Sequence, residues 1–457
     1  MTTDLQGYAT DIPYLRDFKP MLAPAWLDHV ALVAGVAPPA RNDGFAWCDL
    51  GCGQGVTAAI LAATHPMGVF HGIDAMPAHI DHARGLASEA MVANVEFHAA
   101  DFAAALDLDL PLFDYIVMHG VYTWVDGANQ HALRQLTNRR LKPGGLVYVS
   151  YNAMPGWARD LPFQRVLREL AASFPGDSSA RLAAAAEIVR VLAGARVPAL
   201  TGSFIVSELA ERPEDYSPAY LVHEFMPAAW RPLYVTEVRM AMKTIGLVPV
   251  GSATLIENFD PLMLGEAARA TLAAIADDDL RELVRDLYLD QRFRCDVFAR
   301  GNRRLEGAER RNRLLASTFA LAHPADRIRY SITTVAGRCS YDNPAARAIV
   351  ATLAEGPRSL AGLSPIPLSA QDVLDNILLL CAAGDAVPAE PGRASVEALN
   401  QAILRRLGGL DEIRSLALPC GTALELDLDL MRLLRDRCET GNARFADWRS
   451  LLASHGL

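Results

Sequence analysis

The chain has 457 residues, of which 51% are apolar and 21% are charged, a balance that is typical of globular proteins and excludes a disordered chain. At roughly 150 residues per domain, this length predicts two or three domains. A formal net charge of −10 excludes a protein that binds nucleic acid through a broadly basic surface.

The first residues, MTTDLQGYATDIPY, have neither the basic nor the apolar segment of a secretory signal. No apolar run approaches the roughly 20 residues that cross a membrane. The seven cysteines are scattered, and their odd number fits a reducing compartment. Cys48 and Cys52 are not followed by a second pair at ligand spacing, so we interpret them as small packing residues. We therefore expect a cytoplasmic protein with no membrane span and no metal site.

Between residues 45 and 152, short apolar runs alternate with helical patterns, which is the signature of parallel β-α-β units. Five strands joined by helical crossovers predict an α/β fold with a Rossmann-like, doubly wound and mostly parallel sheet. The predicted strands are 45–50, 69–74, 95–101, 113–120 and 146–152, and the predicted helices between them are 56–65, 77–90 and 129–140.

The rest of the chain predicts a helical insertion and two further domains. Residues 158–232 read mainly as helices, and a helix followed by a returning strand over 233–255 brings the chain back to the sheet, so the core is predicted to span 1–256. Residues 257–330 predict a helical middle domain. Residues 331–457 predict a C-terminal domain whose order of helices and strand resembles a winged helix. Because this segment is not strongly basic, we favour a protein-contact or structural role for it over DNA binding.

The segment DLGCGQG at 49–55 lies between the first strand and the first helix, where tight turns and exposed backbone N–H groups require glycine. A dinucleotide fingerprint needs G-x-G-x-x-G, but the third glycine comes one place early, at Gly55. Nicotinamide and flavin cofactors are therefore disfavoured. An acidic residue followed by G-x-G-x-G, here Asp49, Gly51 and Gly53, resembles motif I of class I S-adenosylmethionine methyltransferases.

Two further acids stand at the ends of the next strands. Asp74 ends the second strand and can accept hydrogen bonds from both ribose hydroxyls of a nucleoside, and Asp101 ends the third and can accept from an adenine amino group, with Phe102 beside the ring. Each aspartate alone could simply cap the following helix. Three acids at three successive strand ends, on the edge where such sheets bind ligands, favour the cofactor interpretation.

The acceptor of the methyl group should arrive where the fourth and fifth strands end, in HGVYTWV at 119–125 and SYNAMPGW at 150–157. Aromatic faces there would stabilise the sulfonium and a methylammonium product, although core packing is an equally open role for each ring. His119 and Gly120 are predicted to lie near the cofactor. The candidates for the acceptor pocket are Tyr122, Trp124, Tyr151, Asn152 and Trp157.

The segment YLVHEFMP at 220–227 adds His223 and Glu224, a pair that could orient or deprotonate an acceptor. A contact between the insertion and the core is the equally open alternative for His223.

The order of these motifs, together with GYATDIPY at 7–14, LKPGG at 141–145 and DQRFRCDVFARG at 290–301, resembles bacterial methyltransferases that carry a methyltransferase regulatory domain. The resemblance covers nearly the whole chain, and the group includes rickettsial protein-lysine methyltransferases that modify an outer-membrane protein. In those lysine methyltransferases the tyrosine and aspartate of the N-terminal motif are adjacent, whereas here two residues separate Tyr8 from Asp11. Val56 and Thr57 also follow the glycine loop in place of the usual Gly and Asn. The chain therefore resembles a sister branch of that group. By analogy with other class I enzymes, Tyr14 is expected to fold over the cofactor.

The resemblance implies an enzyme that uses S-adenosylmethionine and releases S-adenosylhomocysteine. An amine acceptor, such as protein lysine, ranks ahead of a small-molecule or glycan hydroxyl. The alternative to an enzyme is a non-catalytic scaffold that binds the cofactor. The expected partners are a protein or small-molecule methyl acceptor and no nucleic acid, and a homodimer is left open.

Overall fold

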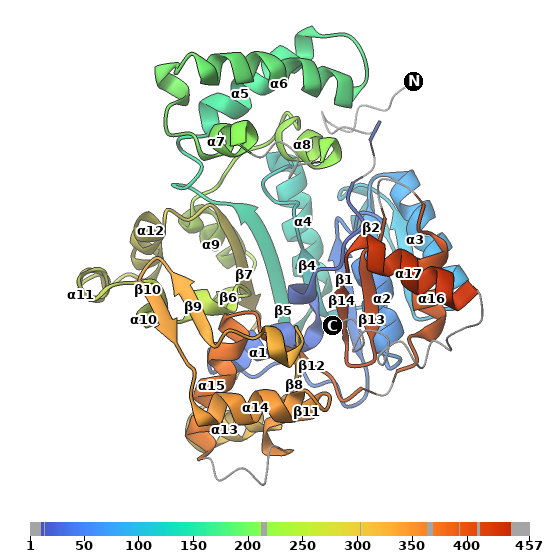
Figure 1. The fold of residues 1–457 in the computed structure, drawn as a ribbon, viewed down its shortest axis with the longest axis vertical. Coiled ribbons are helices and arrows are strands. Elements are labelled where there is room, and N and C mark those ends of the chain that lie inside the picture. The colour runs from blue at the N-terminus through green and yellow to red at the C-terminus, as the bar shows by residue number, and fades with distance from the viewer. Residues whose placement is uncertain are drawn as a thin grey trace.

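A seven-stranded sheet forms the centre of the protein, with strand order β3-β2-β1-β4-β5-β7-β6 (Figure 1). The computed structural model describes residues 11–12, 14–211, 217–301, 303–362, 369–392, 394–408 and 412–439. Strands β1 to β5 are parallel, whereas β7 runs antiparallel to both β5 and β6. The strands are β1 (Phe45–Leu50), β2 (Gly68–Asp74), β3 (Val95–Ala99), β4 (Phe113–Met118), β5 (Leu141–Asn152), β6 (Val248–Ser252) and β7 (Phe293–Ala299).

The central strands are apolar because helices cover both faces of the sheet. All six residues of β1 and of β4 are buried. One face packs against α1 (Pro24–Val33), α2 (Val56–Thr64) and α3 (Pro77–Glu89). The other packs against η2 (Ala104–Asp107), α4 (Gly127–Arg140) and α9 (Val235–Lys243). A short helix, η1 (Pro20–Leu22), precedes α1. This arrangement confirms the predicted Rossmann-like, doubly wound sheet.

A helical insertion follows β5 and forms the upper layer in Figure 1. It comprises α5 (Leu161–Ser173), α6 (Ser178–Gly194), η3 (Pro198–Leu200), α7 (Phe204–Glu211) and α8 (Pro218–Phe225). These helices have their own apolar cluster, which includes Trp157, Phe163, Phe225 and Trp230 and extends to Trp124 after β4. The insertion therefore packs directly on the end of the sheet where the predicted site residues lie.

The prediction that residues 257–330 are wholly helical is wrong. The segment begins with η5 (Leu255–Asn258), α10 (Asp260–Met263), α11 (Glu266–Ala273) and α12 (Asp278–Leu289), but β7 then enters the central sheet between β5 and β6. A boundary at residue 256 would therefore cut through the sheet.

The remaining described residues form small sheets and helices that pack back onto the core. A three-stranded antiparallel sheet has the order β11-β8-β12, and the winged-helix assignment stays a prediction. The elements are α13 (Gly307–Ala316), β8 (Thr318–Leu321), η6 (Ala325–Arg327), β9 (Ser331–Thr334), β10 (Gly337–Ser340), α14 (Pro344–Leu353), β11 (Arg358–Ser359), η7 (Leu360–Gly362), α15 (Ala370–Ala382), β12 (Ala386–Ala389), α16 (Glu397–Arg405), β13 (Ser415–Leu418), β14 (Thr422–Glu425) and α17 (Leu428–Glu439).

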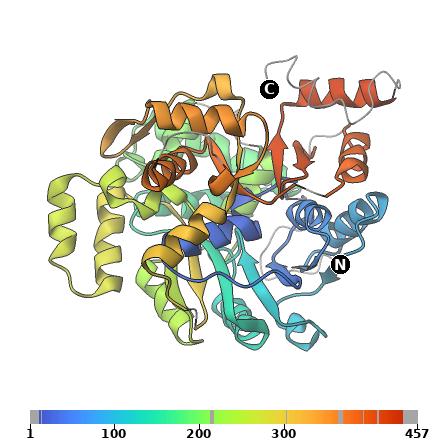
Figure 2. The same cartoon turned by 90° about the horizontal axis from the view of Figure 1, so that it is seen from below.

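The last of these elements lie against the helices that follow β1 and β2. Helix α16 contacts α3, and the β13–β14 hairpin contacts α2 (Figure 2). An ion pair of 2.8 Å joins Arg406 to Glu89, and another of 2.5 Å joins Arg41 to Glu390. Helix α16 and the hairpin thus pack against and support α2 and α3, the helices that follow the glycine loop and β2. Among the described residues, no helix combines the length and apolarity needed to cross a membrane.

Candidate active site

The glycine loop after β1 is held against the end of β2. The amide N–H groups of Gly51 and Cys52 donate to the carbonyl of Ile73, at 2.8 and 3.1 Å. Gly51 has φ near +89°, and a Cβ atom there would lie 2.4 Å from a methyl group of Val121. Gly55 is also left-handed, at φ +73°, and starts α2. Only glycine accommodates both these backbone angles and the close approach, so this path of the loop requires glycine at both positions.

The carboxylate of Asp74, at the end of β2, organises the loop. One oxygen accepts from the N–H of Gly53 at 2.9 Å, and the other accepts from the N–H of Met76 at 2.9 Å. The second oxygen also lies 3.2 Å from Nδ1 of His79. Because Nε2 of His79 accepts from the N–H of Tyr14, the imidazole proton must sit on Nδ1 and point at Asp74. His79 thereby links the N-terminal segment to this carboxylate.

These residues line a cavity of about 270 Å³ at the tips of the parallel strands. All the predicted cofactor residues except Asp49 line it: Tyr14, Gly51, Gly53, Asp74, Asp101, Phe102, His119 and Gly120. The other lining residues are Ala75, Met76, His79, Val121, Trp124, Val125, Asp126, Asn129 and Ala229. The sequence prediction missed these, apart from Trp124, which was predicted for the acceptor pocket.

Asp49 lines a smaller adjoining pocket that shares Tyr14, Gly51, Gly53 and His119 with the main cavity. Its side chain is buried, and Oδ1 has no hydrogen-bond partner. Burial, and to a lesser extent the nearby charge of Asp74, raise the pKa of Asp49 to about 8. A buried carboxyl group without a partner is a position where a ligand cation can bind.

His119 forms a fixed and uncharged part of the cavity wall. Its Nδ1 lies 2.8 Å from the Tyr148 hydroxyl, and the neighbouring N–H of Gly120 donates to the Ser150 hydroxyl at 2.8 Å. Burial lowers the pKa of His119 to about 3, so the imidazole is neutral at physiological pH. It can shape the cavity, but it cannot offset negative charge there.

The cavity is acidic. Three carboxylates line it, those of Asp74, Asp101 and Asp126, and no lysine or arginine is found among its described lining residues. Asp101 accepts from the N–H of Ala104 at 2.8 Å, and Asp126 accepts from the N–H of Asn129 at 2.8 Å as the N-cap of α4. Carboxylates at this edge of the sheet favour a ligand that carries positive charge.

Of the residues predicted for the acceptor pocket, only Trp124 lines the cavity. Its indole N–H donates to the main-chain carbonyl of Glu224, at 3.3 Å. The side-chain amide of Asn152 donates to the Glu224 carboxylate at 2.7 Å, and burial raises the pKa of Glu224 to about 7. Asn152 therefore does not line the described cavity and instead helps to hold α8, which in turn positions Trp124.

Tyr122, Trp157 and His223 also lie behind the wall. The Tyr122 hydroxyl accepts from Arg134 at 2.8 Å. Trp157 packs in the aromatic cluster of the insertion, with the Arg292 guanidinium 4.4 Å from its ring centre. Nε2 of His223 lies 2.9 Å from the Ile12 carbonyl, and its ring packs edge-on against Tyr14. Burial lowers the pKa of His223 to about 4, so it is neutral and supports Tyr14 rather than facing an acceptor.

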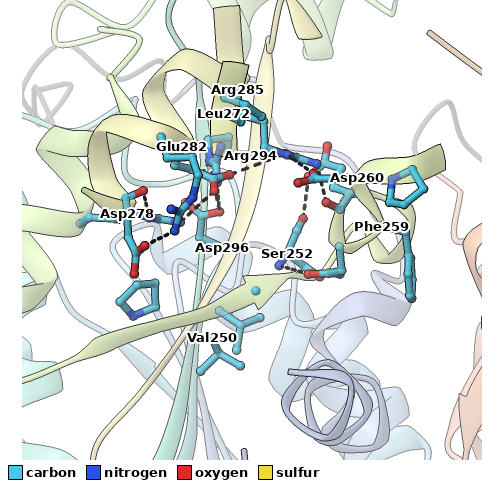
Figure 3. Close-up of a pocket in the computed structure, with 18 residues that line it drawn as sticks. Val250, Ser252, Phe259, Asp260, Leu272, Asp278, Glu282, Arg285, Arg294 and Asp296 are labelled. Carbon is cyan, nitrogen blue, oxygen red and sulfur yellow. Dashed lines mark hydrogen bonds and ion pairs between the residues drawn. The ribbon is translucent and has the colours of Figure 1, made fainter. Parts of the chain in front are cut away.

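Tyr151 does not line the cavity either, and its side chain lies on the face of the sheet opposite to that of Asn152. Its hydroxyl donates to Asp296 on β7 at 2.6 Å. Asp296 pairs with Arg294, whose guanidinium also binds Glu282 and Asp286 of α12. This ion network lines a second cavity of about 570 Å³ between β6 and α12 (Figure 3). Tyr151 thus belongs to that network and not to the wall of the acidic cavity.

The Tyr151→Phe variant is expected to lose stability and to keep ligand binding. Removing a buried hydroxyl that donates to a carboxylate should lower the free energy of unfolding by about 1–3 kcal/mol, measured by denaturant titration. Tyr122→Phe is the matched control, because its hydroxyl is bonded to the partly exposed Arg134 and its loss should cost less. A Tyr151→Phe protein of unchanged stability that had lost its activity would restore the predicted role of Tyr151 at the acceptor.

Comparison with known proteins agrees with this geometry. Residues 41–189 match the model of a methyltransferase domain, and residues 217–300 match that of a predicted methyltransferase regulatory domain. An uncharacterized protein of Synechocystis sp. is 29% identical over 449 residues, which cover 95% of this chain and 89% of that protein. An uncharacterized protein of Rickettsia prowazekii is 33% identical over 162 residues, which cover 35% of this chain and 62% of that protein.

Among solved structures, PKMT2 from Rickettsia typhi in complex with AdoHcy superposes with a TM-score of 0.70. The match has 20% sequence identity and covers 93% of this chain and 88% of that one. At this identity, the likeness shows a common fold. The two domain matches and this fold bear out the family resemblance that the motifs indicate.

Proposed function

We propose that this chain, a class I methyltransferase with a methyltransferase regulatory domain, transfers the methyl group of S-adenosylmethionine to an amine. The cofactor supplies a methyl group activated by its sulfonium sulfur. In the transfer, the lone pair of the acceptor nitrogen forms the new N–C bond while the C–S bond breaks and its electrons pass to sulfur. A protonated amine must first lose one proton, which frees the lone pair that attacks the methyl group. S-adenosylhomocysteine and a methylated amine are the products.

The residues of the acidic cavity fit this cofactor. Asp74 would accept from ribose hydroxyls, since it lines the cavity and its two oxygens are oriented by the N–H groups of Gly53 and Met76. Asp101 and Phe102 stand at the next strand end, where an adenine would lie. The unpartnered oxygen of Asp49 suits the ammonium group of the methionine part. These assignments are supported by residues that come from three successive strand ends.

The acidic lining carries the inference of an amine acceptor. Asp74 and Asp101 are assigned to the nucleoside, which leaves Asp126 as the carboxylate on the side of Trp124. A protonated amine would be attracted by the Asp126 carboxylate and by the face of the Trp124 indole. A neutral hydroxyl would gain little from either.

Asp126 is also suited to handle the proton. Its Oδ1 is engaged as the cap of α4, accepting from both the N–H and the side-chain amide of Asn129. Its other oxygen can therefore accept a hydrogen bond from the acceptor ammonium and receive its proton. An alkylammonium with a pKa near 10.4 must lose a proton before its nitrogen can attack, and in this proposal the Asp126 carboxylate is the base that receives it.

Labelling tests the class of acceptor directly. We expect that incubation with cofactor labelled in the methyl group, and with protein or small-molecule fractions, will place label on nitrogen, with lysine side chains as the first site to examine. Label on oxygen would identify the hydroxyl-acceptor alternative and contradict the proposal. Tight binding of S-adenosylhomocysteine without label transfer to any fraction would identify a non-catalytic scaffold instead.

The Asp126→Asn variant tests the residue that carries the inference. Asparagine keeps an oxygen to cap α4 but removes the charge, so kcat/KM for an amine acceptor should fall about tenfold, as expected for the loss of one charge-assisted hydrogen bond. The Kd for S-adenosylhomocysteine, measured by calorimetry, should stay the same. Asp109→Asn, an exposed aspartate outside the cavity, is the matched control for lost charge. Unchanged acceptor kinetics in Asp126→Asn would contradict this role.

A further inference from the structure

Two histidines and a glutamate meet on the outer strands of the sheet, away from the acidic cavity. His71 lies on β2, and Glu96 and His98 lie on the edge strand β3. His71 is paired in register with Glu96, and Ile73 with His98. Paired residues of parallel strands, and residues two apart on one strand, point to the same face. All three side chains therefore project from one face of the sheet.

Their ligand atoms are spaced as a metal site requires. Nδ1 of His71 lies 3.1 Å from Nε2 of His98. In a tetrahedral zinc site with Zn–N bonds of about 2.0–2.1 Å, two ligand nitrogens are about 3.3 Å apart. One ligand atom from each of the three residues lies within 4.8 Å of the other two. The two nitrogens are thus already close to the required separation. The rings are nearly parallel, with 5.4 Å between their centres, so they must tilt towards a common point and the carboxylate must move inward.

The burial of the three residues makes that movement easy. The ring of His71 is buried and rests edge-on against Phe113, with 5.5 Å between ring centres. The side chain of His98 is 13% exposed, whereas that of Glu96 is 69% exposed and free to rotate. The site therefore has a fixed pair of imidazoles on the inner side and an adaptable carboxylate on the outer side. Water can complete the coordination from the open side.

We propose that His71, Glu96 and His98 bind one divalent transition-metal ion of the zinc type, which clamps the edge strand β3 to β2. Imidazole and carboxylate are the ligands that such ions accept. The cysteine pattern, on which the prediction of no metal site was based, plays no part here. The inference is independent of the proposed methyl transfer.

The competing interpretation is a simple hydrogen bond between two neutral imidazoles, in which one ring donates to the other. Metal binding would require that proton to move to the other nitrogen of its ring, leaving both facing nitrogens as ligands. The two interpretations differ in one respect that can be measured. Glu96 already lies 3.8 Å from Nδ1 of His98, but only a metal site makes the affinity for Zn²⁺ depend on its carboxylate.

Zinc titration of the full-length protein, after treatment with a chelator, tests the proposal. In competition with a chromogenic chelator, the wild-type protein should bind one Zn²⁺ ion per chain, and its thermal midpoint should rise with the free Zn²⁺ concentration. Glu96→Gln should weaken binding about tenfold while leaving the fold intact, because the side chain is exposed. His98→Asn should abolish it. The Co²⁺-loaded protein should show a spectrum without thiolate bands.

His131→Gln is the matched control, because His131 is exposed on α4 and bonded only to Gln135 among the described contacts. It should bind Zn²⁺ as the wild type does. Zinc affinity that is unchanged in both Glu96→Gln and His98→Asn, or no stoichiometric binding at all, would overturn the proposal and leave the hydrogen-bonded imidazole pair. Thiolate bands in the Co²⁺ spectrum would assign the ion to cysteines and overturn it as well.

Discussion

Asp74→Ala is expected to lower the affinity for S-adenosylhomocysteine by at least about a hundredfold. Two hydrogen bonds from ribose hydroxyls to a carboxylate would be lost, each worth about 1.5–3 kcal/mol. The same change removes the acceptor for the N–H groups of Gly53 and Met76 and the partner of His79, so the glycine loop also loses its anchor. Isothermal titration calorimetry with S-adenosylhomocysteine measures the effect.

Asp74→Asn separates the two contributions. The amide keeps one oxygen as acceptor, so its affinity should lie between that of Asp74→Ala and that of the wild type. Asp109→Ala, at an exposed position outside the cavity, should bind as the wild type does. Thermal unfolding of each variant shows whether the fold survives. A folded Asp74→Ala protein with wild-type affinity would contradict the assignment of Asp74 to the cofactor.

The cofactor half of the cavity was largely predictable because its signals are local. Asp49, Asp74 and Asp101 each end a strand of a β-α-β unit, and the parallel connection places successive strand ends at one edge. His79 was missed although it stands only five residues after Asp74, since a histidine in the first turn of a helix has many structural roles. Its importance depends on the N-terminal segment, where Tyr14 donates to its ring.

The acceptor half was predicted poorly because it depends on which way side chains point and on distant packing. Tyr151 and Asn152 are adjacent, so at most one of them could face the cavity, and the structure shows that Asn152 is engaged by Glu224 of the insertion. Asp126 was overlooked because an aspartate before a helix is usually only a cap. Its place beside Trp124 in the cavity wall follows from the path of the loop after β4.

Strand β7 was missed because a strongly charged helix, α12, precedes it, and the charged residues Arg294 and Asp296 continue that pattern into the strand. Both charges are buried in the sheet, where they neutralise each other and bind α12 and Tyr151. Buried ion networks of this kind cannot be distinguished from surface charge in a sequence.

Tyr8, part of the N-terminal motif, lies outside the described residues.

The second large effect concerns Asp49, whose protonation should control cofactor binding. Its pKa is raised to about 8, first by burial and then by the charge of Asp74. An aspartate whose pKa is higher in the folded than in the unfolded chain destabilises the ligand-free protein increasingly as the pH rises from about 4 to 8. The ammonium group of the cofactor would stabilise the ionised carboxylate. Binding should therefore be coupled to the loss of a proton from Asp49.

The affinity for S-adenosylhomocysteine should consequently rise with pH. Below pH 8 the ionised fraction of Asp49 grows about tenfold per pH unit, so Kd should fall about seventyfold between pH 5.5 and 7.5. The dependence should flatten near pH 8, where Asp49 is half ionised and the ligand's own ammonium group begins to lose its proton. Calorimetry at several pH values, in buffers with different heats of ionisation, gives both Kd and the number of protons released.

Asp49→Asn provides the matched control, because the amide has the same shape and no ionisation in this range. Its Kd should be nearly independent of pH, similar to that of the wild type at pH 5.5 and much weaker at pH 7.5. A buried carboxyl that had only a packing role would give parallel pH profiles for the two proteins. Parallel profiles, or a wild-type Kd that does not change between pH 5.5 and 7.5, would therefore exclude Asp49 as the ligand of the ammonium group and leave Asp74 as the principal charged contact.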